Sequence, residues 1–288
     1  MEQDKMNIQW YPGHMTKTRR QIEADLKQVD AVCEIVDARI PMSSRNPDID
    51  SICGNKPRII VLNRMDLADP EGTKRWSEYF KSKGMAVVVT DCKSRKGINS
   101  FQPAARSVLK EKIQRDAAKG MSRPLRIMIV GIPNVGKSTL INQISGRKGA
   151  KAENRPGVTR GKQWVTVDTS LLLLDTPGIL WPKFEDPEVG MMLAYTGAVK
   201  DGILDIEELA CRLISLLHLR YPQALKERYG IEAEQGTPGY ELLEMAGRKR
   251  GFLVSGGEVN TERMAKVLVD EYRNGKLGRF TLEEPEVG

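Results

Sequence analysis

Short aliphatic runs alternate with longer amphipathic stretches over the first two thirds of the chain. Nearly continuous apolar runs are typical of strands buried on both faces, as in a parallel sheet. The strand candidates are Ala31–Val36, Arg58–Leu62, Met85–Thr90, Leu125–Val130 and Leu171–Leu174. Strands that alternate with helices predict a doubly wound α/β fold, with a mostly parallel sheet and helices on both of its faces.

Apolar residues at helical spacing fill the intervals between these strands. Pro70–Gly84 carries three aromatic residues at i, i+3 and i+4, and Ile98–Lys119 repeats apolar residues with the same period. Such stripes indicate core faces rather than ligand contacts. Lys162–Asp168 alternates polar and apolar residues, which predicts an edge strand antiparallel to its neighbour.

The pattern becomes helical throughout after about residue 187. The segments with helical periodicity are Leu204–Leu219, Tyr240–Arg250 and Thr261–Asn274. We therefore expect two domains: a sheet domain over residues 1–186, with an N-terminal helix at about 15–28, and a small, mainly helical domain over residues 187–288.

Composition points to a folded, basic protein. Apolar residues make up 40% of the chain, and the formal net charge is +7. A basic balance favours polyanionic partners, although many basic proteins bind no nucleic acid. The four scattered cysteines favour reduced thiols over disulfides or zinc. With no signal-peptide pattern, and no apolar run near the roughly 20 residues that span a bilayer, we expect a cytoplasmic protein without membrane contact.

A glycine-rich segment directly follows the fourth strand candidate. Gly131–Ser138 reads GIPNVGKS and matches GxxxxGK[ST], and a helix is predicted from Lys137. The glycines let backbone N–H groups wrap phosphate oxygens, and the positive end of the helix faces the same anion. Lys137 is expected to reach the β- and γ-phosphates, and the Ser138 hydroxyl to bind Mg²⁺. Because a strand precedes this segment and a helix follows it, we interpret the match as a P-loop and not as a chance occurrence.

A second motif, DTPG, ends the fifth strand candidate at the spacing from the P-loop that is usual in small GTPases. Asp175 is expected to help hold Mg²⁺, and the Gly178 N–H to sense the γ-phosphate. Thr159, in the polar loop between the two motifs, is the candidate switch I threonine that closes on Mg²⁺ and the γ-phosphate. The alternative is that Thr159 is an ordinary loop residue.

The sequence Asn63-Arg64-Met65-Asp66 follows the second strand candidate and resembles the guanine-reading motif NKxD. The Asp66 carboxylate would accept from guanine N1–H and N2–H₂, which adenine cannot offer, and Asn63 would brace the loop. Arg64 replaces the usual lysine. Its stem can still cover the base, but a planar guanidinium does not make the contacts of an ammonium group.

Asp91-Cys92-Lys93 follows the next strand, where a SAK-like loop would place backbone N–H groups against guanine O6. The guanine motifs therefore precede the P-loop, whereas in ordinary GTPases they follow the DxxG motif. A circular permutation of one GTPase sheet explains this order, and it tethers the helical domain directly to switch II. The expected GTP-binding residues are Asn63, Arg64, Asp66, Asp91, Cys92, Asn134, Val135, Gly136, Lys137, Ser138, Thr139 and Gly178.

The permuted order and four motifs together resemble the ribosome biogenesis GTPase A family, the bacterial YlqF family, which is related to mitochondrial GTPase 1. The motifs are WYPGHM from Trp10, DARIP from Asp37, the P-loop, and DTPGILWP from Asp175. The resemblance covers essentially the whole chain. It implies a GTPase that binds late precursors of the large (50S) ribosomal subunit, contacts rRNA with its C-terminal domain, and is activated by that particle.

The catalytic candidates are His14, Lys137 and Thr159. Ile179 stands where Ras-like enzymes place a water-orienting glutamine, so the isolated protein should hydrolyse GTP slowly. The resemblance suggests His14 as the substitute, since a histidine can orient water near neutral pH. The alternative is that Trp10–Met15 forms a turn that packs the N-terminus on the domain.

Asn134 occupies the P-loop position at which potassium-activated GTPases carry an asparagine. We expect it to help hold K⁺ near the phosphates, with faster turnover in K⁺ than in Na⁺; otherwise it only shapes the loop. The expected metals are thus Mg²⁺, on Ser138, Thr159 and Asp175, and K⁺, on Asn134.

Basic residues cluster in Arg106–Arg126, Arg147–Lys162 and Gly247–Gly251. Such runs are usually solvated faces, but beside a GTPase core they favour contacts with the rRNA backbone. We expect a monomer that binds GTP or GDP and rRNA, with no DNA partner. The alternatives are an RNA-binding scaffold that keeps GTP as a structural ligand, and a P-loop ATPase, which Asp66 disfavours.

Overall fold

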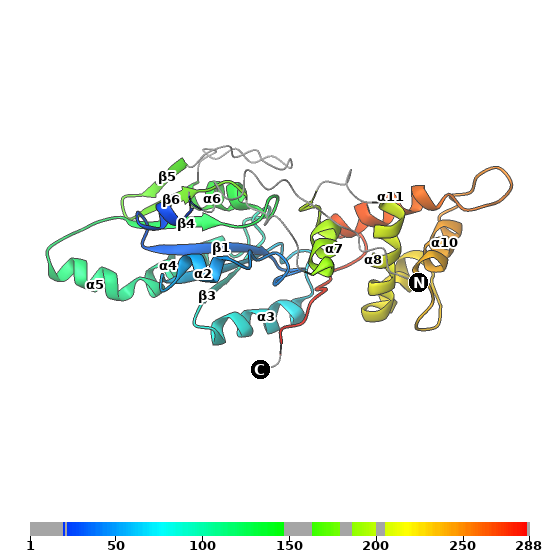
Figure 1. The fold of residues 1–288 in the computed structure, drawn as a ribbon, viewed down its shortest axis with the longest axis horizontal. Coiled ribbons are helices and arrows are strands. Elements are labelled where there is room, and N and C mark those ends of the chain that lie inside the picture. Colours follow the sequence, from blue (N-terminus) through cyan, green and yellow to red (C-terminus); the bar gives the residue numbers. More distant parts are fainter. Residues whose placement is uncertain (1–19, 21, 147–162, 179–185, 200–204, 287–288) are drawn as a thin grey trace.

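The computed structural model describes residues 20, 22–146, 163–178, 186–199 and 205–286. Figure 1 shows a sheet region with the six strands found among these residues, and beside it a helical region that begins with α7 (Pro187–Thr196). Residues 20 and 22–26 are helical and residues 27–28 form a turn, so the helix ends before the expected residue 28; residues 15–19 and 21 of the expected N-terminal helix lie outside the described ones.

The sheet has the order β3-β2-β1-β4-β6-β5. Its strands are β1 (Ala31–Asp37), β2 (Arg58–Asn63), β3 (Ala86–Val89), β4 (Leu125–Val130), β5 (Gln163–Asp168) and β6 (Leu171–Asp175). All neighbours are parallel except β5, which pairs antiparallel with β6. The predicted strands and the antiparallel edge are confirmed. The chain runs outward from β1 through β2 to β3 and then returns to β4 on the other side of β1, so β1 and β4 flank a topological switch point, where α/β sheets bind ligands.

Alternate residues of each central strand pack into different clusters, because successive side chains point to opposite faces. Cys33 and Ile35 of β1 share a cluster with residues of α4 (Phe101–Val108) and α6 (Lys137–Ser145). On the other face, Val36 packs with Trp76 of α3 (Pro70–Ser82), while Val32 packs with Ile49 of α2 (Ile49–Cys53) and with residues 22–26. Both faces of the sheet are therefore covered by helices, as expected.

The predicted helix Ile98–Lys119 is interrupted. It forms the 3₁₀ turn η1 (Ile98–Ser100), α4 and α5 (Lys110–Ala118), with Leu109 outside helical geometry between the last two. Leu109 stays buried in the core, whereas no residue of α5 is buried. Ile113 of α5 is only partly buried against the core, so the helix is interrupted where full burial ends; Figure 1 shows α5 at the outer end of the sheet region.

The helical region contains two helices that periodicity alone did not identify, α7 and α9 (Pro222–Tyr229), both of which begin at a proline. Its other helices are α8 (Ile206–Arg220), α10 (Gly239–Lys249) and α11 (Thr261–Arg273). α8 packs on both α10 and α11 and buries Leu213, Ile214 and Leu217. The segment Phe252–Val259 folds back on itself, and an antiparallel β-bridge joins Leu253 to Val259.

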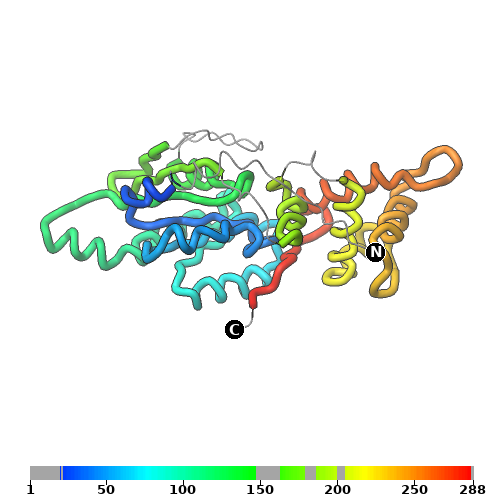
Figure 2. Tube along the Cα trace, viewed as in Figure 1, coloured from blue at the N-terminus to red at the C-terminus, as the bar shows by residue number. Residues whose placement is uncertain are grey.

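The end of the chain returns to the sheet region. After α11 the backbone runs back beside α3, as the red segment of Figure 2 shows. We call Arg279–Glu284 the C-terminal strap. Its central residues Phe280, Thr281 and Leu282 are at most 2% exposed. The Trp76 indole donates to the Glu283 carbonyl, so this strap belongs to the packing of the sheet region although it follows the helical one.

Among the described residues, no helix combines the length and apolarity needed to cross a bilayer.

Two leucines of α8 provide a matched test of this packing. Leu213 is completely buried and Leu219 is 59% exposed. We predict that Leu213→Ala lowers the free energy of unfolding by about 2–5 kcal/mol, because it leaves a cavity. Leu219→Ala should change it by about 0.5 kcal/mol or less. Denaturant unfolding of the purified variants measures both, and equal effects would contradict the placement of α8.

Candidate functional site

The P-loop joins β4 to α6 and approaches the loop after β2 closely. Gly136 begins α6 with φ +108°, and a Cβ there would lie 2.5 Å from the Asn63 side-chain nitrogen. Only glycine allows both this backbone conformation and this approach. The two segments that the sequence assigned to opposite ends of one nucleotide are thus in direct contact.

Lys137 is buried at the start of α6. Its Nζ donates to the carbonyls of Gly131 (3.0 Å) and Ile132 (2.7 Å), and an ammonium group has a third proton for a phosphate oxygen. Burial lowers the pKa of Lys137 to about 8, and nearby Asp175 partly offsets this effect. A bound phosphate would stabilise the charged ammonium.

The Mg²⁺ candidates Ser138 and Asp175 face each other. The Ser138 hydroxyl lies 3.5 Å from one carboxylate oxygen of Asp175, at the end of β6. Within the described part of the chain, the other oxygen, Oδ1, is buried and accepts no hydrogen bond. Burial raises the pKa of Asp175, and Lys137 and Ser138 offset only part of that effect. A hydroxyl and a carboxylate with a buried, unmatched oxygen fit a hard divalent cation.

The described residues include no group of three or more His, Cys, Asp or Glu side chains able to hold a metal. A P-loop hydroxyl and a nearby carboxylate commonly bind Mg²⁺ together with phosphate oxygens, and Ser138 and Asp175 have these donor types. Gly178 lies against the same site: a Cβ on it would be 2.9 Å from Lys137 Nζ and from Pro133. A side chain here would displace the P-loop lysine.

Asn63 is the brace of the site. Its side-chain nitrogen donates to the Val135 carbonyl (2.7 Å), and its side-chain oxygen accepts from the Cys92 N–H (3.1 Å) and the Thr90 hydroxyl (3.2 Å). Three loops, after β2, β3 and β4, are thus joined through one buried amide, and the expected bracing role of Asn63 agrees with this geometry.

Two hydrogen bonds engage backbone N–H groups of the SAK-like loop. The Cys92 N–H is engaged by Asn63, and the Lys93 N–H donates to the Asp91 carboxylate (2.9 Å). Burial raises the pKa of the Cys92 thiol to about 12, so this side chain is a neutral packing group. A role of these N–H groups at guanine O6 stays a prediction.

Arg64 connects the loop after β2 to the P-loop. We call this loop, which contains the NKxD-like residues Asn63–Asp66, the guanine loop. It has a left-handed backbone (φ 63°), and its guanidinium donates to the Asn134 carbonyl at 3.0 Å. Its Nε lies 3.6 Å from Asp37. Burial lowers the pKa of Arg64, and Asp37 counteracts this. Asp66, the proposed base reader, is exposed two residues further on.

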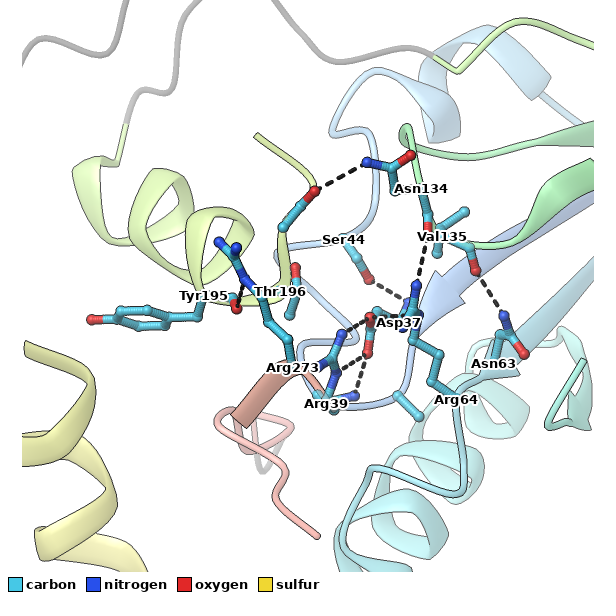
Figure 3. Close-up of polar contacts among 12 residues, drawn as sticks. Asp37, Arg39, Ser44, Asn63, Arg64, Asn134, Val135, Tyr195, Thr196 and Arg273 are labelled. Atoms are coloured by element: carbon cyan, nitrogen blue, oxygen red, sulfur yellow. Dashed lines mark hydrogen bonds and ion pairs between the residues drawn. The ribbon is translucent and has the colours of Figure 1, made fainter. Parts of the chain in front are cut away.

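Asn134 links the P-loop to the helical region. It also has a left-handed backbone (φ 61°), and its side-chain nitrogen donates to the Gly197 carbonyl at the end of α7 (3.1 Å). Figure 3 shows this contact together with Arg273 of α11, which donates to the carbonyls of Ala194 and Tyr195.

The sequence motif DARIP contains a buried ion pair whose role the sequence did not reveal. Arg39 is 1% exposed and binds both carboxylate oxygens of Asp37, at 2.9 and 2.7 Å. Burial alone would raise the pKa of Asp37, but Arg39 and, to a smaller extent, Arg64 lower it overall. The Arg39 guanidinium also lies 5.4 Å from the ring centroid of Tyr272 in α11. Asp37 thus lies between the guanine-loop arginine and the helical region (Figure 3).

Several predicted residues fall outside the described ones. His14, Thr159 and Ile179 are among them, as is the basic segment 147–162. Thr139 is half-buried in the first turn of α6. Asp66, in the loop after β2, and Lys137, at the start of α6, belong to neighbouring segments that are joined by the contacts of Asn63 and Arg64 with the P-loop.

The chain is similar to known proteins along nearly its full length. Residues 126–229 match a family model described as 50S ribosome-binding GTPase. The ribosome biogenesis GTPase A of Priestia megaterium is 49% identical, covering 97% of this chain and 98% of the relative, and that of Thermotoga maritima is 34% identical, covering 97% and 95%. Mitochondrial ribosome-associated GTPase 1 of Mus musculus is 32% identical over 95% of this chain and 89% of its own.

Two solved structures of YlqF proteins are similar to this chain in fold. A GDP-bound structure of TM YlqF has a TM-score of 0.63 and 30% identity, and covers 93% of this chain and 100% of its own. A structure of GNP-bound YlqF from T. maritima has a TM-score of 0.61, at 30% identity, over 94% of this chain and 99% of its own. The fold comparison thus agrees with the sequence comparison.

The metal assignment can be tested through nucleotide binding. We predict that Asp175→Asn loses about ten- to 100-fold of the apparent Mg²⁺ affinity, because an amide lacks the charge that a divalent cation needs. The measurement is GDP affinity during a Mg²⁺ titration, starting from EDTA. Asp116→Asn, which neutralises a partly buried carboxylate paired with Lys112 on α5, is the control. An unchanged Mg²⁺ response of Asp175→Asn would remove this residue from the metal site.

Proposed function

The chain belongs to the ribosome biogenesis GTPase A family, and on that premise we propose that it hydrolyses GTP as a switch in a late step of large ribosomal subunit assembly. The observation that carries the nucleotide assignment is the pair of contacts from Asn63 and Arg64 to the P-loop carbonyls of Val135 and Asn134. They hold a guanine-type motif and a phosphate-type motif in one site, despite the permuted order of the chain.

In the proposed mechanism each residue has a distinct task. Lys137 binds the β- and γ-phosphates, Asp66 selects guanine, and the Gly178 N–H senses the γ-phosphate. Ser138 and Asp175, with Thr159, would hold Mg²⁺, which neutralises charge that develops on the phosphates. The donor types of these residues, and the placement of those that the structure describes, support this proposal.

K⁺ is a second proposed cofactor. The Asn134 side chain donates through its nitrogen to Gly197, which leaves its oxygen as the atom that would ligate a monovalent cation.

Hydrolysis by the isolated chain should be slow, because Ile179 cannot orient water. We propose that His14 supplies this function when a ribosomal particle is bound.

The rRNA contacts are assigned to two exposed surfaces that carry basic residues. In α10, Met245, Arg248 and Lys249 are exposed and share one face, since they are three to four residues apart. At the opposite end of the molecule, Arg126 lies over the exposed ring of Trp164, 5.8 Å from its centroid. Cations bind phosphates and aromatic rings stack on unpaired bases, so both surfaces suit RNA.

Base recognition is tested by changing one atom. We predict that Asp66→Asn weakens GDP binding by about 100-fold or more, because a site built to pair with a polar group rejects its mismatch. The same variant should prefer XDP, since the Asn amide can donate to the xanthine O2 that replaces the guanine amino group. Competition with fluorescent nucleotides measures both. Unchanged GDP affinity, or equal binding of ADP, would contradict a guanine site.

The catalytic proposal is tested by turnover with purified large-subunit precursors. We predict that His14→Ala reduces particle-stimulated GTP turnover by about 100-fold while GDP affinity stays unchanged. His14→Gln should recover part of the rate, because an amide can still orient water. If stimulation is intact in His14→Ala, this residue is not catalytic; if the particle stimulates no turnover in the unaltered chain, the scaffold alternative is favoured.

A further inference from the structure

The guanine loop is held from outside the GTPase motifs, by the segment that follows α11. Arg279 donates through Nε to the Asp66 carbonyl at 3.0 Å, and the Phe280 N–H donates to the Leu67 carbonyl at 2.9 Å. Two consecutive carbonyls of the base-reading loop thus accept from two consecutive strap residues. The Leu67 side chain also packs on the Gly275 backbone, where a Cβ would come within 2.6 Å of it.

The strap is itself fixed to the sheet region on its far side. The Leu282 N–H donates to the Arg39 carbonyl (2.7 Å), and the Glu283 carboxylate accepts from the N–H groups of Met42 and Ser43. The Trp76 indole donates to the Glu283 carbonyl. These bonds anchor the strap around the loop that contains the Asp37–Arg39 pair.

The helical region holds the same strap from the other direction. Arg220, at the end of α8, donates to the Leu282 carbonyl (2.8 Å), and the Tyr221 hydroxyl donates to the Thr281 carbonyl (2.8 Å). The ring of Tyr221 contacts Phe280 edge-on, with 4.9 Å between the centroids. The position of the strap is therefore set jointly by the sheet and by α8.

We propose that the C-terminal strap is a positioning element for guanine recognition, with Arg279 as the residue that holds Asp66 in place. The proposal rests on the guanine site assigned above and extends it to a segment distant in sequence from every nucleotide motif. Its consequence is physical coupling. Because the strap joins α8 and α11 to the Asp66 loop, a partner that shifts the helical region changes nucleotide affinity, and bound nucleotide changes partner affinity by the same factor.

The test compares Arg279→Ala with a matched control that removes a different contact of the same strap. Arg75 in α3 forms an exposed ion pair with Glu284, the last residue of the strap. Arg279→Ala should weaken GDP binding about three- to tenfold, the effect of one lost hydrogen bond, and Arg279→Lys should recover part of it. Arg75→Ala should change GDP affinity by less than about twofold.

Base discrimination separates positioning from general destabilisation. IDP lacks the guanine amino group, so a displaced Asp66 loses less on IDP than on GDP. Arg279→Ala should therefore lower the ratio of GDP to IDP affinity by about threefold, whereas Arg75→Ala should leave it unchanged. Titration of the full-length variants with both nucleotides measures this ratio.

The outcomes are distinct. If Arg279→Ala leaves both GDP affinity and the ratio unchanged while Asp66→Asn loses GDP, the strap proposal is overturned and the guanine site stands. Equal losses in Arg279→Ala and Arg75→Ala would also overturn it, since the effect would then be general. If Asp66→Asn itself binds GDP normally, the guanine site fails and the strap proposal fails with it.

Discussion

One buried carboxamide keeps the nucleotide-binding loops together. Asn63 donates to the P-loop and accepts from the loop after β3, while its own backbone ends β2. A side-chain amide can donate and accept at once, which no aliphatic or carboxylate side chain of similar size can do. Because the bonds are buried, each lost partner would leave an unsatisfied polar group at a cost of about 1–3 kcal/mol. The arrangement of Asp66 relative to Lys137 depends on this residue.

Circular permutation leaves this geometry intact because a sheet is defined by neighbouring strands, and chain order can change around it. β1 lies between β2 and β4, so the guanine loop and the P-loop emerge at the same edge whichever strand comes first. The permutation changes only the position at which the chain leaves the sheet. Here the helical region follows the DTPG strand, and the strap that comes after it returns to the loop that follows β2. The two ends of the nucleotide site thus both meet the helical region, through Arg279 and through the contact of Asn134 with Gly197.

The sequence predicted the features that are local. Aliphatic runs identified the parallel strands because burial on both faces leaves few polar positions. The P-loop and the segment Asn63–Asp66 were recognised by the strands that precede them. It could not show that Leu109 interrupts a helix, because the break depends on where the core ends. Nor could it assign the Asp37–Arg39 pair a role, since its neighbours Arg64 and Tyr272 are brought close only by folding. The strap carries no motif, and many of its bonds use backbone atoms, which any sequence has. His14 and Thr159 stay predictions.

The most direct test of the account is a crystal structure of the chain with Mg²⁺ and a non-hydrolysable GTP analogue. The account predicts one nucleotide, with its guanine edge on the Asp66 carboxylate and its terminal phosphates on Lys137 Nζ, beside a metal on Ser138. A nucleotide whose base contacts other residues while its phosphates occupy the P-loop would contradict it.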